Sequence, residues 1–230
     1  MRESPCGERM ARILLASESE RRRDWLASFL GGEEVNFHSR GLSAEEAVAP
    51  GFLDVSEKVE FTCMAKAMSA SEEQSILNSE KNGENEVFDM VIVSDTLVED
   101  PDDHLVSMGK PNSDSEAVAM LLRLSGNRHR VWSSTAILSR PGGPLFDISL
   151  HGGWTSNIWT ESSIVEFEDL SEESMVELIK SESWRGKAGS YDLAGEASIH
   201  CKLVEGEEVT VLGLASESME FLRGEISRQR

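Results

Sequence analysis

Residues 13–32 read ILLASESERRRDWLASFLGG. The four apolar residues at 13–16 are typical of a short buried strand. Apolar residues resume at 25–26 and 29–30, which is the spacing of one helix face, and the glycines at 31–32 would end that helix. The stretch therefore predicts a strand, a turn and a helix in succession.

The rest of the chain mixes helix and strand patterns, and we expect a mixed sheet in an α/β fold. Residues 1–12 form a polar tail, 13–230 form a single domain, and 33–54 are loop-like. The acidic residues at 100–103 are typical of the turn of a hairpin, and the polar stretch 78–87 of an exposed insertion. Helices are expected at 56–77, 113–124, 171–182 and from 215 onward, and further strands at 90–96, 129–138, 145–150, 157–167, 197–204 and 208–213.

The composition narrows the range of partners. The chain has 230 residues, 42 of them acidic and 22 basic, and its formal net charge is −20. Such a charge repels duplex phosphates and anionic membrane surfaces, so we expect neither as a partner, but it does not exclude a small anionic ligand bound by local charge. Cys6, Cys63 and Cys201 are too few and too scattered for a disulfide framework or a metal site. Neither a membrane span nor a signal peptide is evident, so we expect the cytoplasm.

The turn after the first strand is a candidate anion site. It presents Ser17 and Ser19 just before the predicted helix, whose free backbone N–H groups and positive end attract anions. Arg21, Arg22 and Arg23 follow, and guanidinium groups can fork onto phosphate oxygens. The alternative is a helix N-cap followed by solvated arginines. Three arginines in the first helical turns oppose the helix dipole, which disfavours a purely stabilising role.

Asp95 stands at the expected carboxyl end of the strand at 90–96, where ligands gather in open α/β sheets. An aspartate there can hold a metal or accept a proton from water. The alternative is an Asx-type turn that begins the hairpin. Lys66, Lys110 and Lys187 each lie beside glycine or alanine. Together with the arginines they would form a phosphate-binding wall, although each alone is explained as a solvated surface lysine.

These pieces, in this order, resemble the Maf family of nucleotide pyrophosphatases. Residues 15–26, LASESERRRDWL, are similar to the family's opening Leu-Ala-Ser-x-Ser-Pro-Arg-Arg-x-Glu-Leu-Leu, with Glu20 in place of proline. Residues 93–96, VSDT, resemble its Gly-Ala-Asp-Thr, and 109–111 match its Gly-Lys-Pro. Further similar pieces are Glu116-Ala117…Met120-Leu121, Leu124-Ser125-Gly126…His129-Arg130-Val131, Lys187-Ala188-Gly189-Ser190-Tyr191 and Val211-Leu212-Gly213-Leu214, so that the resemblance covers residues 12 to about 222.

The resemblance implies a fold and a set of site residues. The fold would be an elongated mixed sheet flanked by helices, similar to that of inosine-triphosphate pyrophosphatases, with two lobes around a cleft, and the protein would be a homodimer. Asp95 would activate the attacking water. Asp95 and Glu46 would lie at a divalent ion, Mg²⁺ or Mn²⁺, with Glu45 as the alternative to Glu46. The residues implied to contact the nucleotide are Ser17, Arg21, Arg22, Lys66, Thr96, Lys110 and Lys187.

The implied reaction is hydrolysis of a nucleoside triphosphate to the monophosphate and pyrophosphate. Arg21 and Thr96 match the branch that acts on dTTP and UTP, whereas the 7-methyl-GTP branch has tryptophan and glutamine there. Residues 192–195, Asp-Leu-Ala-Gly, depart from the Gly-Ile-Gln-Gly of the dTTP/UTP branch, and Ala194 lacks the hydrogen bonds of a glutamine amide. We expect activity on dTTP, UTP or modified nucleotides. The alternatives are a 7-methyl-GTP pyrophosphatase and, given the family's association with septum formation, a non-catalytic nucleotide-binding regulator of cell division.

Overall fold

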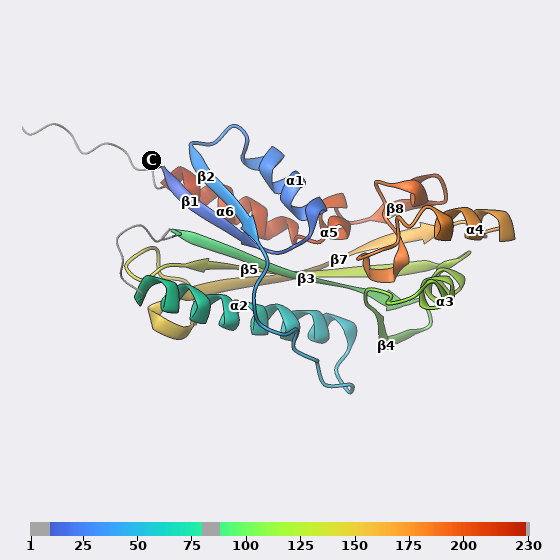
Figure 1. Ribbon diagram of the computed structural model, residues 1–230, viewed down its shortest axis with the longest axis horizontal. Helices are drawn as coiled ribbons and strands as arrows, with labels where there is room; N and C mark the ends of the chain where they lie inside the picture. Colours follow the sequence, from blue (N-terminus) through green and yellow to red (C-terminus); the bar gives the residue numbers. More distant parts are fainter. Residues whose placement is uncertain (1–9, 80–87, 229–230) are drawn as a thin grey trace, which may run out of the picture.

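An open sheet of eight strands runs the length of the protein and carries helices on both faces (Figure 1). The computed structural model describes residues 10–79 and 88–228. Strands follow the order β2-β1-β3-β5-β7-β6, with β4 added beside β3 and β8 beside β7. Strand β1 is parallel to β2 and β3, and the other pairs are antiparallel. The sheet is therefore mixed, as the sequence predicts.

The elements alternate along the chain. The strands are β1 (Ala11–Ala16), β2 (Val35–Arg40), β3 (Met90–Asp100), β4 (Asp103–Met108), β5 (Arg128–Ser139), β6 (Ile148–Ser149), β7 (Thr155–Phe167) and β8 (Cys201–Glu205). The α-helices are α1 (Glu20–Leu30), α2 (Val55–Ser79), α3 (Asp114–Leu124), α4 (Glu172–Lys180), α5 (Glu208–Leu212) and α6 (Ser216–Arg228). Short 3₁₀ turns occupy His151–Gly153, Ala188–Ser190 and Glu196–Ile199. None of the helices in the described ranges is long and apolar enough to cross a membrane.

Most predicted helices begin where a serine caps them. Ser19 accepts a hydrogen bond from the backbone N–H of Arg22 at the start of α1, and Ser113 accepts one from Glu116 at the start of α3. Ser171 caps α4 in the same way. These side chains satisfy backbone donors that a helix start leaves without partners, and they explain why sequence patterns located these helices.

Several predictions about the strands were wrong. The stretch 33–54, expected to be loop-like, contains strand β2. No residue of β2 is fully buried, so the strand leaves no apolar pattern in the sequence. It forms through backbone pairing with β1. Residues 208–213 form helix α5 rather than a strand, although Val209, Thr210 and Val211 favour strands. Tertiary context overrides that preference, and Gly213 ends the helix with a φ of 116°. Of the strand predicted at 145–150, only β6 (Ile148–Ser149) forms. Most of the insertion expected at 78–87, namely 80–87, lies outside the described residues.

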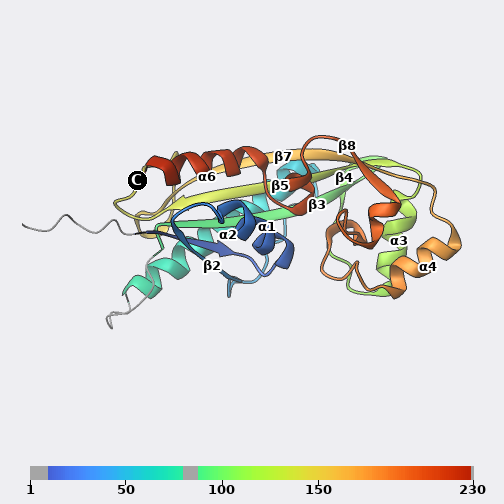
Figure 2. The same cartoon turned by 90° about the horizontal axis from the view of Figure 1, so that it is seen from above.

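The apolar core has three parts that divide the protein into two lobes. In the first lobe, α1 and α6 cover one face of the sheet around Ile13 and Ile92, while α2 covers the other face around Val93. In the second lobe, α3 and α4 pack on the far ends of β3, β5 and β7 around Val98. Figure 2 shows α3 and α4 gathered at one end of the sheet, away from α2 and α6.

A polar band crosses the sheet between the two lobes. Ser94 on β3 and Ser133, Ser134 and Thr135 on β5 are all almost completely buried. The Ser94 hydroxyl donates to the backbone oxygen of Gly213 at 2.5 Å, and Thr135 Oγ1 accepts from the backbone N–H of Ala215 at 2.9 Å. Buried polar groups need such partners, so this band ties the α5–α6 junction to the centre of the sheet.

A buried histidine links the sheet to the loop that follows α4. His129 on β5 lies 2.8 Å from the hydroxyl of Tyr191, and both side chains are buried among the apolar residues of the second lobe. Burial lowers the pKa of His129 to about 4, from the 6.5 of an exposed histidine. The folded protein therefore holds this imidazole in its neutral form at pH values where an unfolded chain would protonate it.

The lowered pKa of His129 predicts a loss of stability in acid. Above about pH 6.5 neither state is protonated, and as the pH falls toward 4 only the unfolded chain binds the proton, which favours unfolding. From about pH 7 to about pH 4.5, wild type should lose about 2 kcal/mol more unfolding free energy than His129→Gln, which can keep a hydrogen bond to Tyr191. Urea unfolding at both pH values measures this difference. Equal losses in the two proteins would refute the assignment.

Candidate functional site

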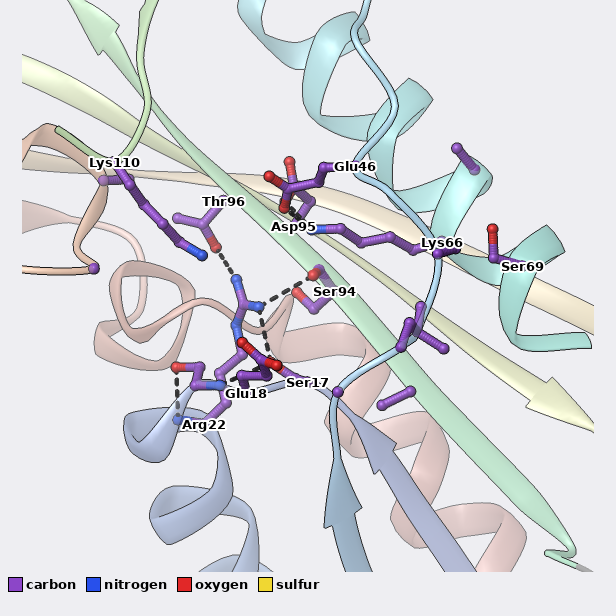
Figure 3. Close-up of a pocket in the computed structure, with 18 of the residues that line it drawn as sticks. Ser17, Glu18, Arg22, Glu46, Lys66, Ser69, Ser94, Asp95, Thr96 and Lys110 are labelled. Atoms are coloured by element: carbon purple, nitrogen blue, oxygen red, sulfur yellow. Dashed lines mark hydrogen bonds and ion pairs between the residues drawn. The ribbon is translucent and has the colours of Figure 1, made fainter. Parts of the chain in front are cut away.

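A cavity of about 500 Å³ opens where the two lobes meet, beside the polar band of the sheet. Figure 3 shows side chains entering it from the start of α1, from the middle of β3, from α2 and from the segment after β4. The predicted residues that line it are Ser17, Arg21, Arg22, Glu46, Lys66, Asp95, Thr96 and Lys110. Lys187 lies just outside the lining, although its neighbours Gly186 and Ala188 belong to it. The fold thus brings together cations that are far apart in sequence.

Asp95 lies in the interior of β3, because this strand continues to Asp100. The expectation that Asp95 ends the strand was therefore wrong; pairing with β5 on one side and, from Val98 on, with β4 extends it. The carboxylate of Asp95 points toward α2. Thr62 Oγ1 donates to Asp95 Oδ2 and Lys66 Nζ donates to Asp95 Oδ1, each at 2.5 Å. Because these residues are four apart, both stand on the same face of α2 and orient the two oxygens.

Lys66 joins two carboxylates. Its ammonium lies 2.5 Å from Asp95 Oδ1 and 2.8 Å from Glu46 Oε1, and Figure 3 shows the end of the side chain next to both residues. Burial opposes the charge of Lys66, but the two carboxylates together raise its pKa. The hydrogen bond from Lys66 in turn lowers the pKa of Glu46. Glu45 also lines the cavity, but Glu46 is the residue whose carboxylate reaches this centre.

Arg22 carries a buried charge without a carboxylate partner among the described residues. Its guanidinium donates to Thr96 Oγ1 at 2.7 Å, to the backbone oxygen of Ser94 at 3.1 Å and to Ser17 Oγ at 3.4 Å. Its Nε is buried and has no hydrogen-bond partner within residues 10–79 and 88–228. Burial lowers the pKa of Arg22, since removal from water disfavours the charged form. A guanidinium held this way by neutral groups is prepared to bind an anion.

Gly213 makes room for this arrangement. A Cβ atom at that position would lie 2.5 Å from Arg22 Nε and 3.0 Å from Thr96 Oγ1. Its φ of 116° also lies in the region that only glycine adopts without strain. The Val-Leu-Gly-Leu stretch near the end of the chain therefore contributes to the site by packing against Arg22.

The remaining cations differ in their surroundings. Arg21 Nη1 lies 3.3 Å from Asp192 Oδ1, and Lys187 Nζ lies 3.6 Å from Asp192 Oδ2. Lys110 is exposed, and Figure 3 shows it reaching into the cavity from the segment after β4. Lys110 forms no ion pair with another residue in the described part of the chain, so its charge remains available to a ligand.

Some site residues could not be found from sequence patterns, and others left a signal. Thr62 and Ser69 share the helix face of Lys66 by spacings of four and three, which a helical projection of 56–77 would show. Glu18 lines the cavity from the turn before α1. Asp192 belongs to the stretch that departs from the family motif, but no local pattern relates it to Arg21, because their contact spans 171 positions of sequence.

The cysteines take no part in the site chemistry that the geometry supports. Cys63 and Cys201 are free and buried, and burial raises the pKa of each thiol to about 12. Neither therefore forms a reactive thiolate near neutral pH. Cys6 lies outside the described residues.

The carboxylates of Glu46 and Asp95 fit a hard divalent cation. Both direct an oxygen at one point, which the ammonium of Lys66 occupies in this structure, so the site already stabilises positive charge there. Magnesium is commonly held by one or two carboxylates and completes its shell with water and substrate phosphates. No group of three or more His, Cys, Asp or Glu side chains suited to a metal occurs within residues 10–79 and 88–228. Two protein carboxylates together with substrate phosphate oxygens match the ligands that magnesium commonly takes.

Comparison with known proteins places the chain in a family. A family model described as "Maf: Maf-like protein" matches residues 12–223. A dTTP/UTP pyrophosphatase of Geobacillus sp. (strain WCH70) is 39% identical over 54% of this chain, and the match spans little more than half, 58%, of that protein. Proteins of the same name from Pyrococcus abyssi and Bacillus cereus are 29% and 31% identical, over 88% and 90% of this chain and 89% and 86% of their own lengths. The chain belongs to the Maf family.

The guanidinium of Arg22 is buried without a carboxylate partner in the described residues. We therefore expect Arg22 to contribute more to anion binding than to the stability of the fold. Arg22→Met removes a buried charge that no carboxylate compensates, so the free energy of unfolding should change by less than about 1 kcal/mol. The affinity for inorganic tripolyphosphate should fall on the order of 100-fold, because a charge-assisted contact is lost. Urea unfolding and titration calorimetry measure the two effects.

Arg23→Met is the matched control, since Arg23 is the next residue of α1, is exposed and pairs with Asp24. It should leave tripolyphosphate binding within about twofold of wild type. Equal losses of affinity in the two variants would mean that the arginines act only through overall charge.

Proposed function

We propose that this protein hydrolyses dTTP and UTP to the monophosphate and pyrophosphate. The single observation that carries the proposal is the cavity itself, in which Arg22 and Lys110 meet a carboxylate, Asp95, held by α2. Relatives aligned over most of the chain bear the name dTTP/UTP pyrophosphatase. A net charge of −20 makes this local gathering of cations stand out, since only a local cluster can attract a polyanion here.

The cations would hold the triphosphate. The guanidinium of Arg22 and the ammonium of Lys110 offer donors without carboxylate partners in the described residues, and Ser17 adds a hydroxyl at the start of α1. Close contacts between partly buried unit charges can reach about 4 kcal/mol each. A few such contacts would dominate affinity and would stabilise the pyrophosphate as it leaves.

Asp95 would act as the proton acceptor. A water molecule attacks the α-phosphorus and transfers a proton to the Asp95 carboxylate, while the bond between the α-phosphorus and the bridging oxygen breaks and pyrophosphate departs. The hydrogen bond from Thr62 would keep the carboxylate of Asp95 in a defined orientation during this step. Such positioning of a base accounts for much of an enzyme's advantage over free water.

Glu46 and Asp95 would hold Mg²⁺ or Mn²⁺ when the ion is bound. The ion would supply neutralisation of phosphate charge, which neither carboxylate can supply. Lys66 would then be released from its bridging position toward the substrate, since two cations cannot share one place between the same carboxylates. Lys66 thus would balance the negative charge of the two carboxylates while no metal is present.

Arg21 and Thr96 support the choice of dTTP and UTP. Both line the cavity, where a bound nucleotide could contact them, and Thr96 Oγ1 accepts a hydrogen bond from Arg22. The alternative substrate is 7-methyl-GTP. The alternative from another functional class is a non-catalytic nucleotide-binding regulator linked to septum formation. The homodimer, the cytoplasmic location and the lack of binding to duplex nucleic acid stay predictions.

Pyrophosphate release from dTTP, UTP, 7-methyl-GTP and ITP in the presence of Mg²⁺ or Mn²⁺ tests the activity. Wild type should turn over dTTP and UTP fastest, and Asp95→Asn should lower kcat by about 100-fold to 10,000-fold, because an amide cannot accept the proton. Glu99→Gln is the control, since Glu99 lies on the same strand and bonds Trp132 outside the cavity lining. Nucleotide binding without any turnover by wild type would favour the regulatory alternative.

A pair of neighbouring glutamates tests the metal site. Glu46→Gln should raise the Mn²⁺ concentration needed for half-maximal activity by about 10-fold or more, because it removes one of two charged ligands. Glu45→Gln should leave it nearly unchanged, although Glu45 also lines the cavity. Activity titrations with Mn²⁺ measure both variants. The reverse order would assign the metal to Glu45.

A further inference from the structure

Glu161 is a carboxylate on β7 that lies outside the cavity lining and holds the start of helix α6. Its Oε2 accepts hydrogen bonds from the backbone N–H of Ser216 at 2.9 Å and from the Ser216 hydroxyl at 2.7 Å. Its Oε1 accepts one from the backbone N–H of Glu217 at 2.8 Å. These are the first two N–H groups of α6, which lack partners inside the helix, so a side chain from a distant strand caps it.

The same carboxylate also contacts the helix that precedes α6. Thr210 Oγ1 on α5 donates to Glu161 Oε2 at 3.5 Å. Glu161 therefore binds the chain on both sides of the junction 213–215, which connects α5 to α6. Figure 1 shows these two helices on the same side of the sheet as α1, the helix that carries Arg22.

The junction between α5 and α6 supports the guanidinium of Arg22. A Cβ atom at Gly213 would lie 2.5 Å from Arg22 Nε and 2.9 Å from Arg22 Nη2, so the Gly213 backbone is in close contact with this group. The hydrogen bonds that hold Arg22 all leave from its two Nη atoms. The contact with Gly213 therefore supports the Nε side of the guanidinium.

A second connection between the junction and Arg22 runs through Ser94. Ser94 Oγ donates to the backbone oxygen of Gly213 at 2.5 Å, and the backbone oxygen of Ser94 accepts from Arg22 Nη1 at 3.1 Å. A displacement of the junction would therefore act on Arg22 by two routes. Because a guanidinium that is already in place loses less freedom when it binds, such a displacement would weaken the binding of an anion.

We propose that Glu161 is a positioning residue for the phosphate site, which acts through the α5–α6 junction to hold the guanidinium of Arg22 in place. This deepens the proposed function and rests on it, because it takes the anion that Arg22 binds to be the phosphate chain of a nucleotide. The competing explanation is that Glu161 only caps α6 and contributes to the stability of the fold.

A double-mutant cycle of Glu161→Ala and Arg22→Met distinguishes these explanations. The affinity of the full chain for inorganic tripolyphosphate is measured by calorimetry. Glu161→Ala alone should lower the affinity about 10-fold, because Arg22 loses its support. In the Arg22→Met background the same substitution should change the affinity by less than about twofold, since no guanidinium remains to be positioned. Equal losses in both backgrounds, or no loss in either, would overturn the proposal.

Glu161→Gln keeps the cycle decisive if Glu161→Ala does not fold. The amide retains one acceptor oxygen for the start of α6, so it should lower the tripolyphosphate affinity by only about threefold. This smaller loss should likewise disappear in the Arg22→Met background, because it also acts through the guanidinium. A loss of the same size in both backgrounds contradicts the proposal for this variant too.

Two control variants separate positioning from stability and from overall charge. Ser171→Ala removes the side-chain cap of α4 in the second lobe. Glu166→Ala removes a carboxylate from the same strand as Glu161, where it pairs with Arg128 and Lys202. Both should bind tripolyphosphate within about twofold of wild type. If Ser171→Ala loses as much affinity as Glu161→Ala, the effect follows stability alone and the proposal fails.

Turnover separates this proposal from the proposed function. In UTP hydrolysis, Glu161→Ala should raise KM about 10-fold and change kcat by less than about threefold, because Asp95 is held from the other face of the sheet by α2. No hydrolysis by wild type, with the binding cycle as expected, would refute the hydrolase and support the role of Glu161. Hydrolysis by wild type with equal binding losses in both backgrounds would support the hydrolase and refute that role.

Discussion

The central strand β3 is apolar toward its start and polar at Ser94, Asp95 and Thr96, and the rest of the structure depends on satisfying these three side chains. A polar group inside a protein needs a hydrogen-bond partner or it costs stability. Successive side chains of a strand point to opposite faces, so the partners come from both sides. Helix α2 supplies Thr62 and Lys66 on one face, whereas α1 and the α5–α6 junction serve the other.

The same constraint creates the cavity. The apolar clusters of the two lobes end where the polar band begins, and the charged residues gather in the space between. Lys66 has carboxylate partners, while Arg22 has only neutral ones among the described residues. An incoming polyanion would therefore meet a guanidinium already held in place. The buried charge of Arg22 would then add little to the stability of the fold, as is common for residues of a binding site.

The family membership and the departures from the family pattern concern different parts of the cavity. Asp95 and Thr96 agree with the pattern of the Maf family, to which the chain belongs. Three neighbouring departures fall at 192–194, next to Arg21, on a loop anchored by Tyr191. The residues that agree with the family pattern and those that depart from it thus lie on separate elements. A loop can change its side chains without disturbing the sheet that positions the reacting groups.

The sequence by itself determined the local elements and the family. Apolar spacing and serine caps located α1, α3 and α4, since these depend on contacts within a few residues. Short motifs in order pointed to Asp95, Arg22 and the lysines. Only the tertiary structure decided what depends on distant pairing: β2 forms against β1, residues 208–212 become helical, and β3 continues past Asp95. It also decided that Lys66 bridges two carboxylates and that Asp192 pairs with Arg21, because such contacts join residues that no local pattern relates.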